Sequence, residues 1–142
     1  MADPRNTVSY TRNQAQDETY IIDASTITFD VTKVNGSAQV GLAVTLSGNN
    51  TIKLTEDGEF VLGKLMKVEG DGKAAVQESG FMTLPGGASA SLTRGKGVVG
   101  ALGASSAKGY IREVATATAA ELGRQRGYIQ DVSDTANVLV KL

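Results

Sequence analysis

The fold class is decided by residues 59–87, EFVLGKLMKVEGDGKAAVQESGFMTLPGG. Two β-prone apolar runs flank the Gly-Asp-Gly of residues 70–72, and a third run, Phe81–Leu84, ends at Pro85. An Asp-Gly pair between two such runs is a strong hairpin signal, because tight turns need positive φ and glycine adopts it without strain. We therefore predict a β-hairpin centred on residues 70–72, to which the other strands are added.

Further strand and turn signals lie on both sides of this hairpin, at intervals of about 8–12 residues. Upstream, Ile27, Phe29 and Val31 alternate with polar residues and predict a half-buried strand, followed by strands at residues 38–46 and 51–54. Downstream, short strands are predicted around residues 98–99, 109–114, 128–132 and 137–142, and residues 115–123 favour one or two helical turns. This pattern is typical of an all-β protein, either a small β-barrel or a β-sandwich, with at most one short helix.

Residues 1–24 differ from the rest of the chain, because they are polar and have no helical period. We predict an extended N-terminal arm here, followed by a single β-rich domain at residues 25–142. A frayed chain end is one interpretation. The other is an arm that becomes ordered on a partner, with tyrosine and arginine as contact residues. In that case the candidate contacts are Arg5, Tyr10, Arg12 and Tyr20, and deletion of residues 1–24 is expected to weaken binding without changing the fold.

The composition excludes several functional classes. The 142 residues contain no Cys and no His, which removes disulfides, thiol nucleophiles, the usual zinc sites and a Ser-His-Asp triad. A net charge of −1 gives no basic excess to neutralise phosphates, so no direct nucleic-acid partner is expected. No apolar run reaches the roughly 18 residues of a membrane-spanning helix, and the N-terminus has no apolar signal-peptide core, so we expect no membrane partner.

Two nucleotide-binding patterns occur by letter only. Residues 95–100, GKGVVG, match GxGxxG, but Gly and Ser follow where the dinucleotide fold needs a helix. Residues 58–64 match GxxxxGK, but Leu65 occupies the position where Ser or Thr would hold Mg²⁺. The acidic turn residues lack the ligand spacing of an EF-hand loop. We therefore expect no cofactor, no metal, no catalytic residues and no enzymatic activity.

Three stretches of this chain resemble a known family. VLGKLMKVEGDGKAAVQESGFMTLPGG, the Gly/Ser-rich segment after it and the C-terminal RGYIQDVSDTANVLVKL resemble the small β-rich decoration (cement) proteins of tailed-phage capsids. The resemblance covers roughly residues 41–142. It implies a β-barrel-like module that binds the major capsid protein on the outer surface of the expanded shell, usually as a homotrimer. It also implies synthesis in the host cytoplasm, a final location in the virion, and no catalytic residues.

Two other functions remain open on sequence grounds. Another structural part of the virion, such as a tail or head-tail accessory protein, would have a similar β-rich and His-free composition. A carbohydrate-binding or hydrolytic β-domain is the alternative from another class. The absence of Trp and the presence of only four scattered Tyr argue against this second alternative, because sugar sites commonly use aromatic platforms.

Overall fold

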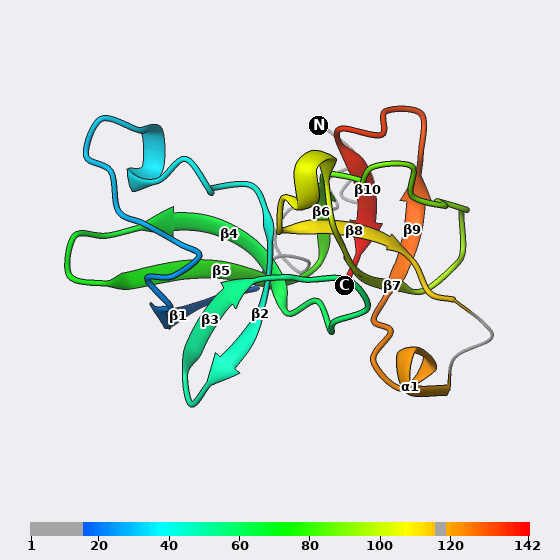
Figure 1. Ribbon diagram of the computed structural model, residues 1–142, viewed down its shortest axis with the longest axis horizontal. Coiled ribbons are helices and arrows are strands. Elements are labelled where there is room, and N and C mark those ends of the chain that lie inside the picture. Colours follow the sequence, from blue (N-terminus) through cyan, green and yellow to red (C-terminus); the bar gives the residue numbers. More distant parts are fainter. Residues whose placement is uncertain (1–15, 116–118) are drawn as a thin grey trace, which may run out of the picture.

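The computed structural model describes residues 16–115 and 119–142 and confirms the all-β class. Five strands close a barrel in the order β1-β3-β2-β4-β5 (Figure 1). Their bounds are β1 Gln16–Ile22, β2 Ala43–Gly48, β3 Thr51–Leu54, β4 Gly63–Val68 and β5 Lys73–Ser79.

The C-terminal half of the chain forms two smaller sheets beside the barrel (Figure 1). One has the order β6-β10-β9, from β6 Phe81–Leu84, β9 Tyr128–Asp131 and β10 Val138–Lys141, and the other pairs β7 Val98–Ala101 with β8 Tyr110–Glu113. Helical structure in the described part of the chain is limited to α1 Ala119–Leu122 and the 3-10 turns η2 Val34–Gly36 and η3 Ala104–Ser106.

The predicted hairpin is confirmed as β4 and β5. Leu65 pairs with Val76 and Val68 with Ala74. The loop contains three residues, 70–72, and the last of them, Gly72, has a φ of +82°. A three-residue loop that ends on a left-handed residue suits the twist of a hairpin, so the glycine is needed there for its backbone conformation.

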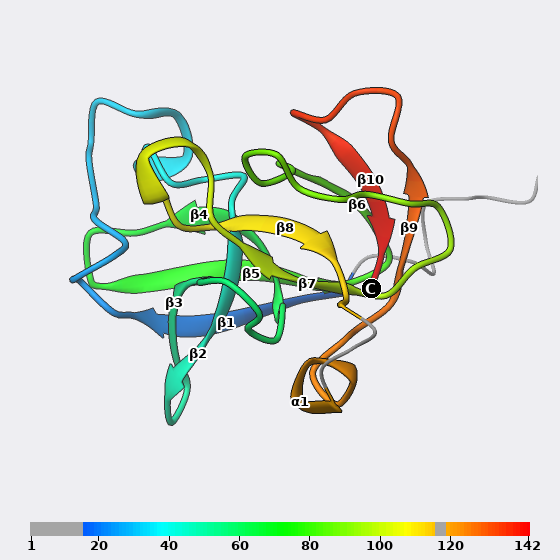
Figure 2. The same cartoon turned by 45° about the vertical axis from the view of Figure 1, so that its right-hand side comes forward.

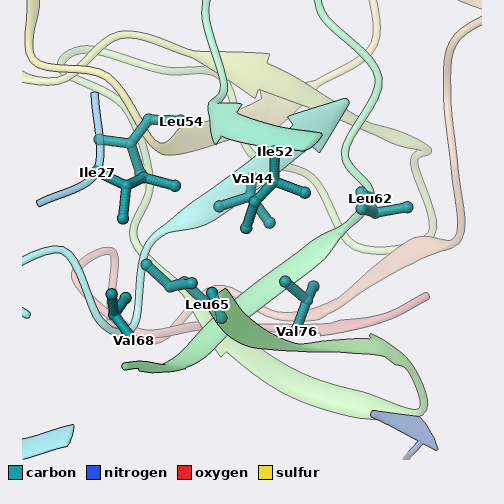
Figure 3. Close-up of a cluster of buried hydrophobic side chains, with 9 residues drawn as sticks. Ile27, Val44, Ile52, Leu54, Leu62, Leu65, Val68 and Val76 are labelled. Carbon is teal, nitrogen blue, oxygen red and sulfur yellow. The ribbon is translucent and has the colours of Figure 1, made fainter. Parts of the chain in front are cut away.

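The core consists of two clusters of aliphatic side chains, as expected for a chain without Trp. The first fills the barrel (Figure 3) and contains Ile27, Val44, Ile52, Leu54, Leu62, Leu65, Val68, Ala74 and Val76. The second lies among the strands of the C-terminal half and contains Ala43, Val61, Met82, Leu84, Val98, Ile111, Ile129, Val138 and Val140. Ala43 and Val61 belong to the barrel half of the chain, so the two parts share a hydrophobic contact.

The barrel includes residues that the sequence assigned to the arm. β1 runs antiparallel to β5, with Tyr20 opposite Ala74, and its end runs parallel to β3, with Ile21 opposite Thr51. Figure 2 shows β1 alongside β5. Tyr20 and Ile22 pack on the barrel core. The structure therefore differs from the predicted boundary at residue 24, because the period-two burial of Tyr20 and Ile22 makes residues 16–22 part of the domain.

The strand predicted around Ile27 and Phe29 is wrong. Ile27 is buried, but the chain then turns, and the Asp30 carboxylate accepts hydrogen bonds from the backbone N–H (2.9 Å) and hydroxyl (2.6 Å) of Thr32. Asn35 follows with a φ of +59°. Asp side chains that bond to the backbone two residues on stabilise turns in place of strands. The apolar side chains after Ile27 therefore lie on a loop.

Candidate interaction surface

The loop of residues 28–36 presents large apolar side chains to solvent. The exposed fraction is 45% for Phe29, 82% for Val31 and 84% for Val34. In Figure 1 this loop, with η2, lies at the upper left, above the turn end of the β4–β5 hairpin. We call the surface formed by Phe29, Val31 and Val34 the apolar loop surface.

Backbone contacts hold this loop in one shape. The Asp30 N–H donates to the Gly36 carbonyl (2.8 Å), and the Gly36 N–H donates to the Lys33 carbonyl (3.1 Å). Gly36 has a φ of +84°, and a Cβ there would lie 1.9 Å from the Val68 carbonyl oxygen. Only glycine allows so close an approach to β4. The loop is therefore fixed to the end of the β4–β5 hairpin.

A groove of about 400 Å³ lies at the junction of the loop and the hairpin. Phe29 and Val31 line one side, and Lys67 and Glu69 line the other. Lys67 and Glu69 form an exposed ion pair with an N–O distance of 3.2 Å. Full burial of a valine side chain is worth about 1.5–3 kcal/mol, so this surface can contribute to a protein contact. The arrangement of exposed apolar groups beside charged groups is typical of interaction sites.

The four contact residues predicted from the sequence are distributed differently. Tyr20 is half-buried in β1, and its hydroxyl donates to the Glu78 carboxylate, so it stabilises the barrel. Arg5, Tyr10 and Arg12 lie outside the described residues. The apolar loop surface was missed because the period-two pattern assigned Phe29 and Val31 to a strand. The Asp-x-Thr turn at residue 30 was the local signal that could have identified it.

A polar cluster on another part of the molecule joins α1 to β8. Arg112 binds Asp57 (Nε–Oδ1 2.9 Å) and Glu121 (Nη2–Oε1 2.6 Å). The Ala115 N–H also donates to Glu121, at 3.0 Å. The bonds from Arg112 and then from this N–H lower the pKa of Glu121 from 4.5 to about 2. This cluster holds the short helix in place. Each oxygen and nitrogen named here already takes part in a hydrogen bond within the cluster.

Substitution Glu121→Gln tests this cluster through its pH dependence. Because the pKa of Glu121 is lowered on folding, its stabilising effect is present above about pH 4.5 and is lost as the pH falls toward 2. We expect the variant to lose about 1 kcal/mol of unfolding free energy at pH 7, as for a partly exposed ion pair. Urea unfolding should show this difference shrinking at pH 3. A constant difference between pH 7 and pH 3 would contradict the assignment, and Glu69→Gln serves as the control.

The two nucleotide-binding letter matches and the acidic side chains can be compared with known site geometries over the described residues. Over residues 16–115 and 119–142, no group of three or more Asp or Glu side chains is arranged to hold a metal ion. Residues 95–100 lead into β7, where Gly100 pairs with Ile111. Lys64 lies in β4, its Nζ donates to the Thr83 hydroxyl (3.1 Å), and burial lowers its pKa. Both letter matches therefore run from a turn into a strand, whereas a phosphate-binding loop leads into a helix.

Within the described ranges, no helix has the length and apolar character required to cross a membrane. Comparisons of the chain with protein-family models, with curated proteins and with solved structures found no match. The structure itself defines the class: an all-β protein built on a closed five-stranded barrel.

Proposed function

We propose that this protein is a structural virion protein that binds the outer surface of the expanded capsid of a tailed phage and stabilises the shell. The observation that supports this most directly is the apolar loop surface, with Val31 and Val34 more than four-fifths exposed on a loop fixed to the barrel. The resemblance of residues 41–142 to capsid decoration proteins supports the same role.

The physical basis of such a role is preferential binding. A protein that binds only the expanded state of a shell stabilises that state by mass action. In this proposal the partner is the major capsid protein, and a homotrimer on a threefold position would strengthen individually weak contacts through effective concentration. A rigid loop favours this use, because little conformational entropy is lost when it binds.

Co-sedimentation tests the proposal directly. The purified protein is mixed with expanded, decoration-free capsids of the parent phage, and unexpanded shells serve as the control. We expect saturable pelleting with expanded shells alone, and the copy number per coat subunit then tests the trimer. An absence of pelleting with both shells would reject the proposal and favour a tail or head-tail component.

The double substitution Val31→Asp and Val34→Asp should abolish this binding. Both side chains are exposed in the free protein, so their replacement leaves the core unchanged, but two carboxylates would be buried in the contact. We expect binding to expanded shells to fall at least tenfold, with an unchanged melting temperature. Leu46→Asp is the matched control, because Leu46 is a 47% exposed apolar residue in β2, outside the apolar loop surface. Equal loss in both variants would contradict the role of the loop.

A further inference from the structure

A pocket of about 490 Å³ lies beside β8, away from the apolar loop surface. Its walls are the small side chains of residues 88–91, Leu102, and the charged side chains of Asp57, Arg112 and Glu113. The Glu113 N–H donates to the Ser91 carbonyl (2.9 Å), which holds residues 88–91 against β8. The volume is within the range of about 300–1,000 Å³ found for small-ligand sites.

Arg112 has no donor left for a ligand in this pocket. Its Nε and Nη2 donate to the two oxygens of Asp57, and its Nη1 and Nη2 donate to the two oxygens of Glu121. The remaining N–H, on Nη1, donates to the Glu113 carbonyl at 3.1 Å. A guanidinium has five N–H donors, and all five are used. The pocket is therefore unsuited to a carboxylate or phosphate, although it contains an arginine.

Glu113 has the opposite property, an acceptor without a donor. Its Oε2 is buried and has no hydrogen-bond partner within the described part of the chain. A buried polar atom without a partner costs about 1–3 kcal/mol, and more when it is charged. Among the residues that line the pocket, the two carboxylates of Asp57 and Glu113 outnumber the single guanidinium of Arg112, so the lining has a net negative charge.

We propose that this pocket binds an alkylguanidinium or alkylammonium group, with the Glu113 carboxylate as its acceptor. The Glu113 side chain lines the pocket, so its carboxylate is within reach of a bound cation, and rotation about its terminal torsion, which is broad in energy, adjusts the carboxylate plane to the ligand. The methylene groups of the ligand then contact Leu102 and the alanines of residues 88–91. The same chemistry occurs in a lysine or arginine side chain of a partner protein and in a free small amine. This inference does not depend on the proposed capsid role.

Titration of the ¹⁵N-labelled protein with three probes tests this assignment. The probes are butylguanidinium, its neutral isostere butylurea, and the peptide acetyl-Gly-Arg-Gly-amide. We expect saturable shifts of the Ser89, Ser91 and Glu113 amides with butylguanidinium, or with the peptide alone if the group must belong to a polypeptide. Butylurea should cause no saturable shift. An equal response to butylurea, or no saturable response to either cation, would overturn the proposal.

Substitution Glu113→Gln is a second test of the same assignment. It keeps the shape of the side chain and removes its charge, so the affinity for the responding probe should fall at least tenfold. Glu69→Gln, a change in the β4–β5 hairpin outside the pocket, should leave it unchanged. If Glu113→Gln fails to fold, the salt dependence of binding to the unmodified protein gives the answer, because a charge-based contact weakens as ionic strength rises. Salt-independent binding would then contradict the role of Glu113.

Discussion

A chain that begins at residue 24 is expected to fail to fold, whereas a chain that begins at residue 16 should fold as the full-length protein does. β1 pairs with β5 from Gln16 to Ile21 and with β3 at Ile21 and Ile22. Its removal would open the barrel and leave the edges of β5 and β3 without partners. It would also uncover the core against which Tyr20 and Ile22 pack.

The size of this effect follows from the interactions that are lost. Burial of two large side chains is worth about 1.5–3 kcal/mol each, and the ladder hydrogen bonds of β1 contribute further. The total is comparable with the roughly 5–15 kcal/mol by which most domains are stable.

Thermal unfolding followed by circular dichroism would measure the effect of each deletion. A cooperative melt of the chain beginning at residue 24, within a few degrees of the full-length protein, would show that β1 is dispensable. The chain beginning at residue 16 is the matched control, since it retains β1 and removes only residues 1–15. That same chain is also the correct one for testing an arm in shell binding. The deletion of residues 1–24 that the sequence suggested would also remove β1, so a loss of binding could come either from the arm or from the opened barrel.

The elements that the sequence predicted well are those governed by local chemistry. The β4–β5 hairpin, β3, β6 and the last strand, β10, each lie beside a glycine, proline or Asx turn that limits the conformations of the chain. The short helix was expected from the Ala-Glu-Leu composition before residue 123, and it is only four residues long. Such signals act within a few residues, so one sequence is sufficient to find them.

Closure of the barrel could not be predicted in this way. The β1 sequence begins with the polar residues QDET, because the outer face and ends of a small barrel are exposed, and its pairing with β5 spans more than 50 residues. The prediction of a strand after Ile27 failed for the opposite reason. Its apolar alternation imitates a strand, but the Asp30 turn determines the backbone. The pocket beside β8 joins Asp57, residues 88–91 and Glu113, which no sequence spacing connects.

Arg126 links the barrel to the C-terminal sheets, and its replacement should destabilise the protein strongly. Its backbone exchanges two hydrogen bonds with Val98, at 3.0 and 3.1 Å. Its guanidinium donates to the carbonyls of Leu62 and Glu78, on two neighbouring strands or their ends. The guanidinium carbon also lies 5.8 Å from the centre of the Phe60 ring. One residue thus contacts β7 through its backbone and the barrel through its guanidinium.

Substitution Arg126→Ala should lower the free energy of unfolding by about 3 kcal/mol, because hydrogen bonds from a charged donor contribute about 1.5–3 kcal/mol and their carbonyl acceptors lose a partner. For a chain of this length the melting temperature should fall by roughly 10 °C. Differential scanning calorimetry would measure both quantities. Arg124→Ala is the matched control, since Arg124 is exposed two residues earlier, and its loss should change stability by no more than about 0.5 kcal/mol.

Substitution Arg126→Lys separates charge from geometry in this link. A lysine retains the positive charge, but its single ammonium group cannot reproduce the planar fork that reaches the Leu62 and Glu78 carbonyls together. We expect its stability to lie between those of the original protein and Arg126→Ala. If Arg126→Lys equals the original protein, charge alone is sufficient, and the two directed hydrogen bonds are not what joins the barrel to the sheets. If Arg126→Ala and Arg124→Ala lose the same stability, other contacts hold the barrel to the C-terminal sheets, namely the shared hydrophobic contact at Ala43 and Val61 and the backbone hydrogen bonds of residues 43–59 with residues 100–109.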